Sequence, residues 1–162
     1  MDYESVTPSY AIHNEVSIRG FFGAYSFLSN SHATPVEFEG IFYPSSENAY
    51  QAAKVAPNER EPFRTCTAAE SKKLWHTRAV YVPDAWDTMK RNIMARVVFD
   101  KFLRNAESRE LLMLTRDKLL EERNERLNVY WGTDKNGEGG NHLGKILMAT
   151  RAYFQEEGFQ NQ

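Results

Sequence analysis

The segment that decides the fold joins a short hairpin to a helix and reads Tyr43-Pro44-Ser45-Ser46-Glu47-Asn48-Ala49-Tyr50-Gln51-Ala52-Ala53-Lys54. Proline donates no backbone hydrogen bond and keeps the preceding residue extended, so the strand before this segment ends at Pro44. Ser45 or Ser46 can then cap a helix, with the carboxylate of Glu47 in its first turn beside the positive end of the helix dipole. We therefore predict a helix that begins directly after Pro44.

The polar side chains of this predicted helix share one face. A carboxylate, a phenol, an amide and an amine follow one another at helical spacing, from the residues Glu47, Tyr50, Gln51 and Lys54. Alanines on the other side allow close packing against a neighbouring element. This pattern is unusual for a plain surface helix and is compatible with a chemically active face. On the pattern alone, the preferred interpretation is still a surface helix on which Glu47 and Lys54 are solvated and Tyr50 is a half-buried anchor.

The same residues carry a resemblance to a known family. The pattern Tyr-Pro-Ser-Ser-Glu-Asn-Ala-Tyr-Gln-Ala-x-Lys, which starts at Tyr43, resembles the signature of the NADAR (YbiA-like) family. Other motifs of that family recur in order between about Gly20 and Phe154, at Tyr25–Asn30, Trp86, Met94, Lys101-Phe102, Trp131-Gly132, Gly139–Gly144, Leu147-Met148 and Arg151. Two places depart from the family pattern. Trp75-His76 replaces Gly-Arg and Asn128 replaces Asp, so no family role is assigned to either.

The resemblance implies a single α+β domain that acts as an N-glycosidase. We expect it to be mostly helical, with a small β-sheet near the N-terminal half. Glu47 and Lys54 are the predicted catalytic residues. Breaking a ribosyl C1–N bond builds positive charge on the sugar, which the Glu47 carboxylate can stabilise or relieve by activating water. Alternatively, a neutral Lys54 amine can attack C1 and hold the opened sugar as a Schiff base while Glu47 transfers protons. Both routes stay open.

Other residues are expected to contact the substrate. Tyr50 and Gln51 would hold ribose hydroxyls, and Trp86 or Trp131 would stack on a base, although Trp86 is equally suited to anchoring the core. The full predicted set comprises Ser29, Asn30, Tyr50, Gln51, Trp86, Met94, Trp131, Gly132, Gly140, Asn141, His142, Leu143 and Gly144.

The glycine-rich segment before Asn141 predicts a helix start. Asn141 is a good N-cap for an amphipathic helix, and glycines there can leave backbone amides exposed beside the positive end of the dipole. A diphosphate would suit such a site. Capping alone is the competing interpretation.

Three functions stay open on these residues. We favour removal of ADP-ribose from ADP-ribosylated guanine in DNA or RNA. The alternatives are cleavage of ribosylamino-pyrimidine phosphates of the riboflavin pathway, and a non-catalytic ADP-ribose-binding module. The expected partner is therefore the ADP-ribose moiety of a modified nucleic acid or of a small nucleotide, with transient DNA or RNA contact, no metal and no cofactor.

Composition narrows the class of protein. The 162 residues predict one domain over residues 16–158, preceded by a flexible arm over residues 1–15. A net charge of −2 argues against binding nucleic acid mainly through its phosphates. A single cysteine, Cys66, fits a reducing compartment, and no apolar run approaches the roughly 18 residues of a membrane span. We expect a soluble intracellular monomer, cytoplasmic or nuclear, without membrane contact.

Local patterns predict the remaining elements. Apolar alternation around Glu39-Gly40 is typical of a tight hairpin, and Thr67–Glu70 has the capping-box pattern of a helix start. We further predict a short strand at Val16–Arg19 and an extended segment at residues 79–83. A long helix capped by Asp84, a helix from Glu107 to Leu114 and a strand or turn at Lys118–Glu121 should follow.

Overall fold

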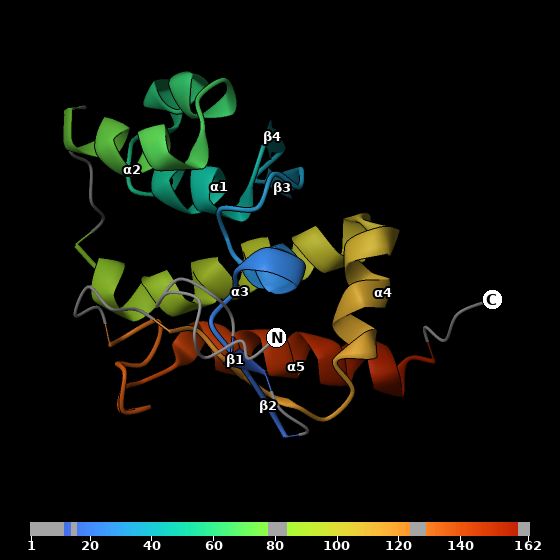
Figure 1. Cartoon of the computed structure of the whole chain (residues 1–162). Helices are drawn as coiled ribbons and strands as arrows, with labels where there is room; N and C mark the ends of the chain where they lie inside the picture. The colour runs from blue at the N-terminus through green and yellow to red at the C-terminus, as the bar shows by residue number, and fades with distance from the viewer. Residues whose placement is uncertain (1–11, 14–15, 78–83, 124–128, 159–162) are drawn as a thin grey trace. The chain divides into compact units, whose positions relative to one another are not determined.

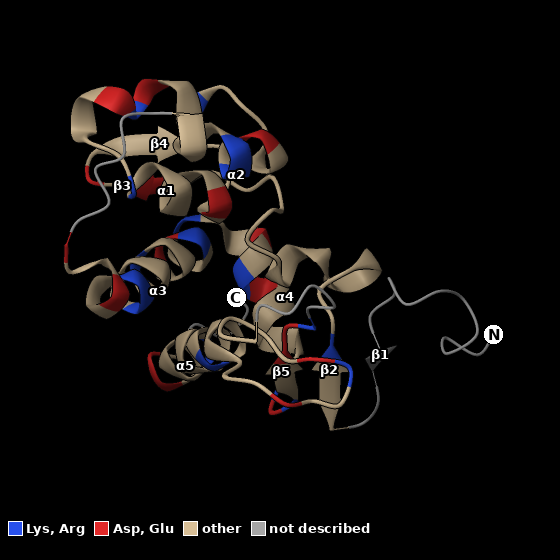
Figure 2. Ribbon diagram, turned by 90° about the vertical axis from the view of Figure 1, so that its left-hand side faces the viewer, with Lys and Arg blue, Asp and Glu red and all other residues tan. Residues whose placement is uncertain are grey.

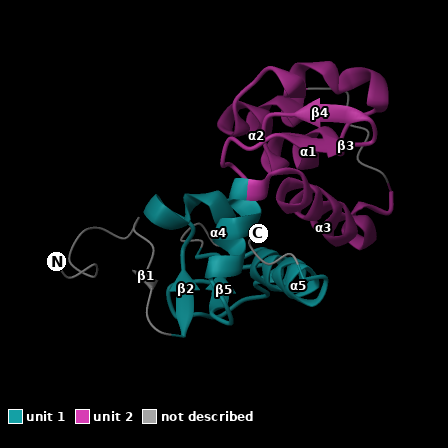
Figure 3. Ribbon diagram, turned by 90° about the vertical axis from the view of Figure 1, so that its right-hand side faces the viewer, with its two compact units in different colours: residues 1–29, 107–162 teal, residues 30–106 magenta. Residues whose placement is uncertain are grey.

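The computed structural model describes residues 12–13, 16–77, 84–123 and 129–158. The chain forms two compact units: unit 1 comprises residues 1–29 and 107–162, and unit 2 comprises residues 30–106 (Figure 3). Helices dominate both units and short strands accompany them, which confirms the predicted α+β fold class (Figure 1).

Unit 2 begins with a hairpin of β3 (Val36–Phe38) and β4 (Ile41–Tyr43), whose antiparallel register pairs Val36 with Tyr43. The turn residues Glu39 and Gly40 have φ angles of 51° and 80°. Positive φ at both central positions matches the right-handed twist of the strands and gives the tight turn that the sequence predicted. The hairpin leads directly into α1 (Ser46–Ala52).

The helix α1 is the central element of unit 2. Ser45 is its N-cap, and the Ser45 hydroxyl accepts a hydrogen bond from the Asn48 amide at 3.2 Å. All seven residues of the helix are buried. Short 3₁₀ turns η3 (Pro57–Glu59) and η4 (Glu61–Arg64) follow, and α1 packs against η4 and against the helices α2 (Ala68–Thr77) and α3 (Trp86–Arg104).

The starts of α2 and α3 differ in how they are capped. Thr67 Oγ1 accepts from the Glu70 amide at 3.2 Å, and Glu70 Oε2 accepts from the Thr67 amide at 2.7 Å, so the predicted capping box is confirmed. At α3 the predicted Asp84 cap is wrong. Ala85 is the N-cap residue, it has no side-chain cap bond, and its carbonyl accepts from the amides three and four residues on. The extended segment predicted at residues 79–83 lies outside the described residues.

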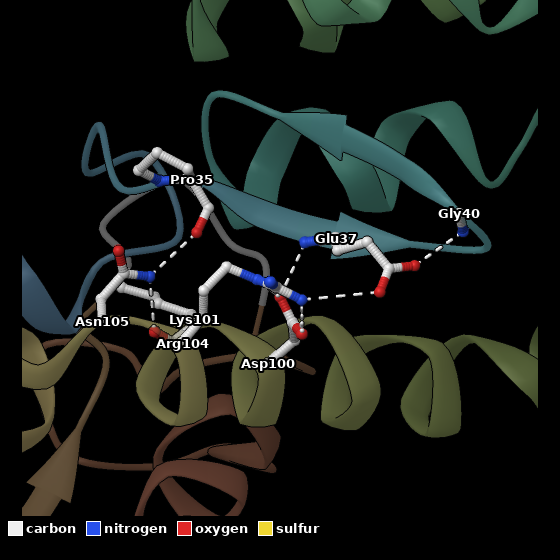
Figure 4. Close-up of polar contacts among 7 residues, drawn as sticks. All are labelled: Pro35, Glu37, Gly40, Asp100, Lys101, Arg104 and Asn105. Atoms are coloured by element: carbon white, nitrogen blue, oxygen red, sulfur yellow. Dashed lines mark hydrogen bonds and ion pairs between the residues drawn. The ribbon is translucent and has the colours of Figure 1, made fainter.

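A polar network fastens the hairpin to the C-terminal half of α3 (Figure 4). Asp100 Oδ2 accepts from the Glu37 amide at 2.6 Å and from Arg104 Nε at 3.0 Å. Arg104 Nη2 also reaches Asp100 Oδ1 at 2.8 Å, and Asn105 Nδ2 donates to the Pro35 carbonyl at 2.9 Å. Because the hairpin runs into α1, this network fixes where α1 starts.

Unit 1 contains a three-stranded sheet in the order β1 (Ile12–His13), β2 (Ser17–Arg19) and β5 (Leu119–Glu121). β1 lies within the segment predicted as a flexible arm, yet it pairs antiparallel with β2. β5 pairs with β2 in parallel, which requires a long crossover connection. The sheet therefore takes a strand from late in the chain, whereas we predicted it for the N-terminal half.

The other elements of unit 1 follow the predicted pattern. Most of α4 belongs to this unit, and α5 packs against β5. Their bounds, with that of the 3₁₀ helix after β2, are η2 (Gly23–Leu28), α4 (Ala106–Leu114) and α5 (His142–Glu156). In the described part of the chain, no helix combines the length and the apolar character needed to cross a membrane.

Asp100 provides a test of the hairpin attachment. Asp100→Ala leaves the Glu37 amide without its acceptor and leaves Arg104 with only its longer, 3.5 Å contact to the Glu37 carboxylate among the ion pairs of the described residues. We expect the free energy of unfolding to fall by about 1–3 kcal/mol, measured by urea denaturation. Asp87→Ala is the control, since the Asp87 side chain is 94% exposed and forms an ion pair with Lys90 on the same helix, one turn away. It should change stability by less than about 0.5 kcal/mol. Equal losses in both variants would contradict this role of Asp100.

Candidate active site

The helix α1 carries a buried carboxylate and amide one turn apart. Gln51 Nε2 donates to Glu47 Oε1 at 2.6 Å, and the two residues are only 6% and 8% exposed. Within the described residues, Oε1 of Gln51 is buried without a hydrogen-bond partner. Buried polar atoms are normally paired, so this carbonyl is available to a ligand hydroxyl or amine beside the Glu47 carboxylate.

Lys54 lies just beyond the helix. The predicted helix runs through Lys54, but α1 ends at Ala52, and the Lys54 amide donates to the Gln51 carbonyl at 3.1 Å in a tight turn. The turn keeps the amine close to the carboxylate. Electrostatic attraction to Glu47 is one of the interactions that act on the pKa of Lys54. The predicted grouping of these side chains is therefore present, although helical geometry does not extend to the lysine.

Three aromatic rings surround the Lys54 amine. Its Nζ atom lies 4.4 Å from the ring centroid of Trp75, 5.1 Å from that of Tyr50 and 5.7 Å from that of Trp86. The Tyr50 and Trp86 rings also contact each other, with centroids 5.4 Å apart. We call Tyr50, Trp75 and Trp86 the aromatic cage. Its members come from α1, α2 and α3.

Burial makes the Lys54 ammonium unusually acidic. The pKa of Lys54 is lowered to about 8, mainly by burial. The nearby Glu47 carboxylate raises this pKa, and the positive charge of Lys90 lowers it further. Removing water penalises the charged ammonium, whereas a nearby carboxylate favours it. The neutral amine is therefore far more populated near neutral pH than in an ordinary lysine.

Trp75 is the residue that the sequence analysis missed. It stands where the family usually has Gly-Arg, and we assigned it no role for that reason. The structure places it on α2, half-buried, with its ring nearest the lysine of the three. One signal could have found it: the capping box fixes the start of a short helix next to α1, and a tryptophan ends its second turn.

Two other predicted residues support α1 from within unit 2. The Asn30 carbonyl accepts from the Glu47 amide at 3.0 Å, so it satisfies one of the free amides at the helix start. Asn30 Nδ2 contacts Met94 Sδ at 3.0 Å, and Met94 is only 3% exposed. Both residues lie against the site as packing partners. Substrate contact by Asn30, Met94 and Ser29, which belongs to unit 1, stays a prediction.

The glycine-rich helix start in unit 1 differs from the expectation. The amides of residues 140–143 each donate to a backbone carbonyl of the 129–132 segment, at 2.6–3.2 Å. Those four amides are therefore occupied, and the exposed amides that we predicted for an anion are not present at these positions. Gly140 has the space for this only because it lacks a side chain, since a Cβ there would lie 2.8 Å from the Tyr130 carbonyl oxygen.

Asn141 takes the N-cap position of α5 but does not cap it with its side chain. Its φ is 46°, its Nδ2 donates to the Leu120 carbonyl at 2.9 Å, and its Oδ1 accepts from the Glu122 amide at 3.1 Å. The side chain thus ties α5 to β5. Gly144 is required beside it, since a Cβ there would lie 2.1 Å from the Leu120 oxygen.

An aromatic cluster flanks the same helix start in unit 1. The Tyr130 ring lies 4.8 Å from that of Trp131 and 4.4 Å from that of His142, measured between centroids. All three are half-buried. Stacking of a base on Trp131, like substrate contact by Gly132, Leu143 and the other residues predicted here, stays a prediction.

The fold and the site define an α+β protein whose central buried helix presents a carboxylate–amide pair beside a caged lysine. A model of the NADAR domain family matches residues 13–155. The chain belongs to this family.

Named relatives agree with this membership. N-glycosidase YbiA of Shigella flexneri is 33% identical over 129 residues, which cover 78% of this chain and 80% of that protein. A riboflavin biosynthesis protein of Vibrio vulnificus is 30% identical over 85% of this chain and 38% of its own length. The NMR structure of Escherichia coli YbiA superposes with a TM-score of 0.78 at 28% identity, over 93% of this chain and 92% of that one.

Replacing Trp75 tests whether the cage sets the acidity of Lys54. Trp75→Ala admits water to the amine, and we expect the pKa of Lys54 to rise from about 8 toward the ordinary value of 10.5. Losing the cation–π attraction acts in the opposite direction, but at about 0.5–1 kcal/mol it amounts to less than one pKa unit. The measurement is the rate at which an amine-selective reagent modifies Lys54 across pH, followed by peptide mass spectrometry.

Trp75→Phe is the matched control for this experiment. It retains a ring over the amine, so the titration midpoint of Lys54 should stay within about one pKa unit of the unmodified protein. An unchanged midpoint in Trp75→Ala would show that other groups exclude water from Lys54.

Proposed function

We propose that this protein is an N-glycosidase that hydrolyses the bond between ribose C1 and a base nitrogen. The observation that carries the proposal is the buried Glu47–Gln51 pair next to the Lys54 amine, whose pKa burial lowers to about 8. The relatives named N-glycosidase support the same reaction class.

Lys54 is suited to act as the nucleophile. With a pKa of about 8, about one tenth of the amine is neutral at pH 7. The neutral Nζ attacks C1, a new C–N bond forms, and the base departs as its C1–N bond breaks. Glu47 takes a proton from the amine and delivers it to the departing nitrogen, so charge does not accumulate on either side.

Water completes the cycle. Ring opening converts the sugar–lysine adduct into a Schiff base at C1, and hydrolysis releases the sugar and regenerates the amine. Gln51 is placed to orient Glu47 through its 2.6 Å hydrogen bond and to hold a ribose hydroxyl through its Oε1 atom. In the alternative route, Glu47 activates water directly and Lys54 is a binding group.

For the substrate, we propose ADP-ribosylated guanine in DNA or RNA, released as ADP-ribose and unmodified base. The aromatic cage around the amine suits a substrate with a planar base, because rings stack on rings. The riboflavin biosynthesis name of one relative favours a second candidate, a ribosylamino-pyrimidine phosphate. The test incubates the purified protein with each of the two substrates and, separately, with ADP-ribosylated protein. The two candidates are distinguished by the base that is released, and release of ADP-ribose from protein would indicate a different substrate class.

The catalytic assignment predicts a clear mutational pattern. Glu47→Ala should lower kcat at least about a hundredfold on either route, because both need its charge or its proton transfer. Lys54→Ala should do the same only if the amine is the nucleophile. Lys72→Ala is the control, since it removes an exposed lysine of α2, and its rate should match that of the unmodified protein.

Borohydride trapping separates the two routes. It reduces a Schiff base to a stable amine, and mass spectrometry should then find an ADP-ribose-derived adduct on the peptide that contains Lys54. No adduct together with a largely retained rate in Lys54→Ala would assign catalysis to Glu47 and water. Tight ADP-ribose binding without cleavage of any substrate would instead indicate a binding module.

A further inference from the structure

Unit 1 contains a polar cavity of about 100 Å³, lined by residues of β2, β5 and the 133–137 loop. A single water needs only about 10–15 Å³ of such space, so a group of several heavy atoms fits. Three cationic side chains and two carboxylates contribute to its wall: Arg19, Arg123, Lys135, Glu121 and Asp134. Blue and red segments accordingly lie together beside the labels of β2 and β5 (Figure 2).

Both carboxylates of the wall are already engaged. Glu121 is 6% exposed, its Oε2 atom pairs with Arg19 Nε at 3.1 Å, and its Oε1 atom accepts from Thr133 Oγ1 at 2.8 Å. Asp134 Oδ1 accepts from the backbone amides of Asn136 and Glu138 at 2.8 and 3.0 Å. Each negative charge thus has its own donors.

Arg123 differs from these two residues at its Nε atom. Within the described residues, its Nε atom is buried without a hydrogen bond, although the side chain is only partly exposed. The arginine guanidinium stays charged at all physiological pH values. A buried guanidinium N–H without an acceptor therefore destabilises the fold, unless an anion or a water molecule in the cavity accepts its hydrogen bond. Lys135, exposed on the same wall, adds a second cation that no carboxylate of the wall holds.

We propose that this cavity binds a terminal phosphate group through Arg123 and Lys135. A guanidinium fork matches the oxygens of a phosphate in pairs, and an ammonium adds a compact charge beside it. The wall also includes Gly137, whose φ of 81° favours glycine and where a Cβ would lie 3.3 Å from Glu121 Oε1. The phosphate can belong to a small sugar phosphate or to the end of a nucleic acid chain.

Calorimetric titration of the full-length protein tests the proposal. The probes are inorganic phosphate, ribose 5-phosphate and a dinucleotide with or without a 5′-phosphate, in buffer free of competing anions. We expect the phosphorylated probes to bind and the 5′-hydroxyl dinucleotide not to bind. Comparison of the affinities for ribose 5-phosphate and for the phosphorylated dinucleotide then shows whether the cavity prefers a small sugar phosphate or the end of a nucleic acid chain.

Three variants localise the binding. Arg123→Gln should weaken phosphate binding about tenfold or more, and Lys135→Gln should weaken it severalfold. Lys135 is exposed, so its replacement keeps the test valid even if Arg123→Gln unfolds, which thermal melting would reveal. Lys145→Gln is the matched control, because it removes an exposed lysine of α5 outside the cavity. No phosphate binding to the unmodified protein, or equal weakening by all three variants, would overturn the proposal. Equal binding of the dinucleotides with and without the 5′-phosphate would overturn the proposal as well.

Discussion

A helix that is buried along its whole length must satisfy its polar side chains from inside the protein, and this constraint organises unit 2. Asn48 on α1 is fully enclosed, and its Nδ2 atom donates to the carbonyls of Phe63 and Cys66 at 2.9 and 2.8 Å. Its Oδ1 atom accepts from the Ser45 hydroxyl, the residue that caps the helix. These bonds tie the residues just before α2 to α1, so they also set where α2 holds Trp75.

A few buried polar atoms of unit 2 do not meet this constraint, and one of them lies in the candidate site. Among the described residues of unit 2, the buried side-chain atoms without a hydrogen bond are Tyr43 Oη, Ser46 Oγ and Gln51 Oε1. Only Gln51 belongs to the cluster that contains Glu47 and the caged amine. An unpaired buried acceptor costs stability, and it is best explained where a ligand supplies the missing donor. For the other two atoms we have no physical account.

Local chemistry could be predicted from the sequence, and contacts across the fold could not. The hairpin at Glu39-Gly40 and the capping box of Thr67 depend on neighbouring residues alone, and both were predicted correctly. The predicted cap at Asp84 failed, because a backbone carbonyl can start a helix without side-chain help. The role of Asn141 depends on β5, a strand some twenty residues earlier, which no local pattern could indicate.

In the candidate site, too, the local features could be predicted from the sequence and the contacts between helices could not. Helical spacing correctly brought Glu47 and Gln51 together, because i and i+4 residues are neighbours on any helix. The cage needed tertiary information, since its rings arrive from three helices. A family pattern even directed attention away from Trp75, because a departure from the pattern offers no role to transfer. Of the three rings, that of the departing residue Trp75 is nonetheless the nearest to the amine.

A lowered pKa does not by itself mark a catalytic lysine, and unit 2 contains the comparison that shows this. Burial lowers the pKa of Lys101 on α3 to about 7, further than that of Lys54. Lys101 is only 1% exposed, so no substrate carbon can approach its amine without displacing the core. Lys54 remains partly exposed, and the charge of the nearby Glu47 carboxylate raises its pKa. Access and a nearby proton acceptor, rather than acidity alone, are therefore what support the role proposed for Lys54.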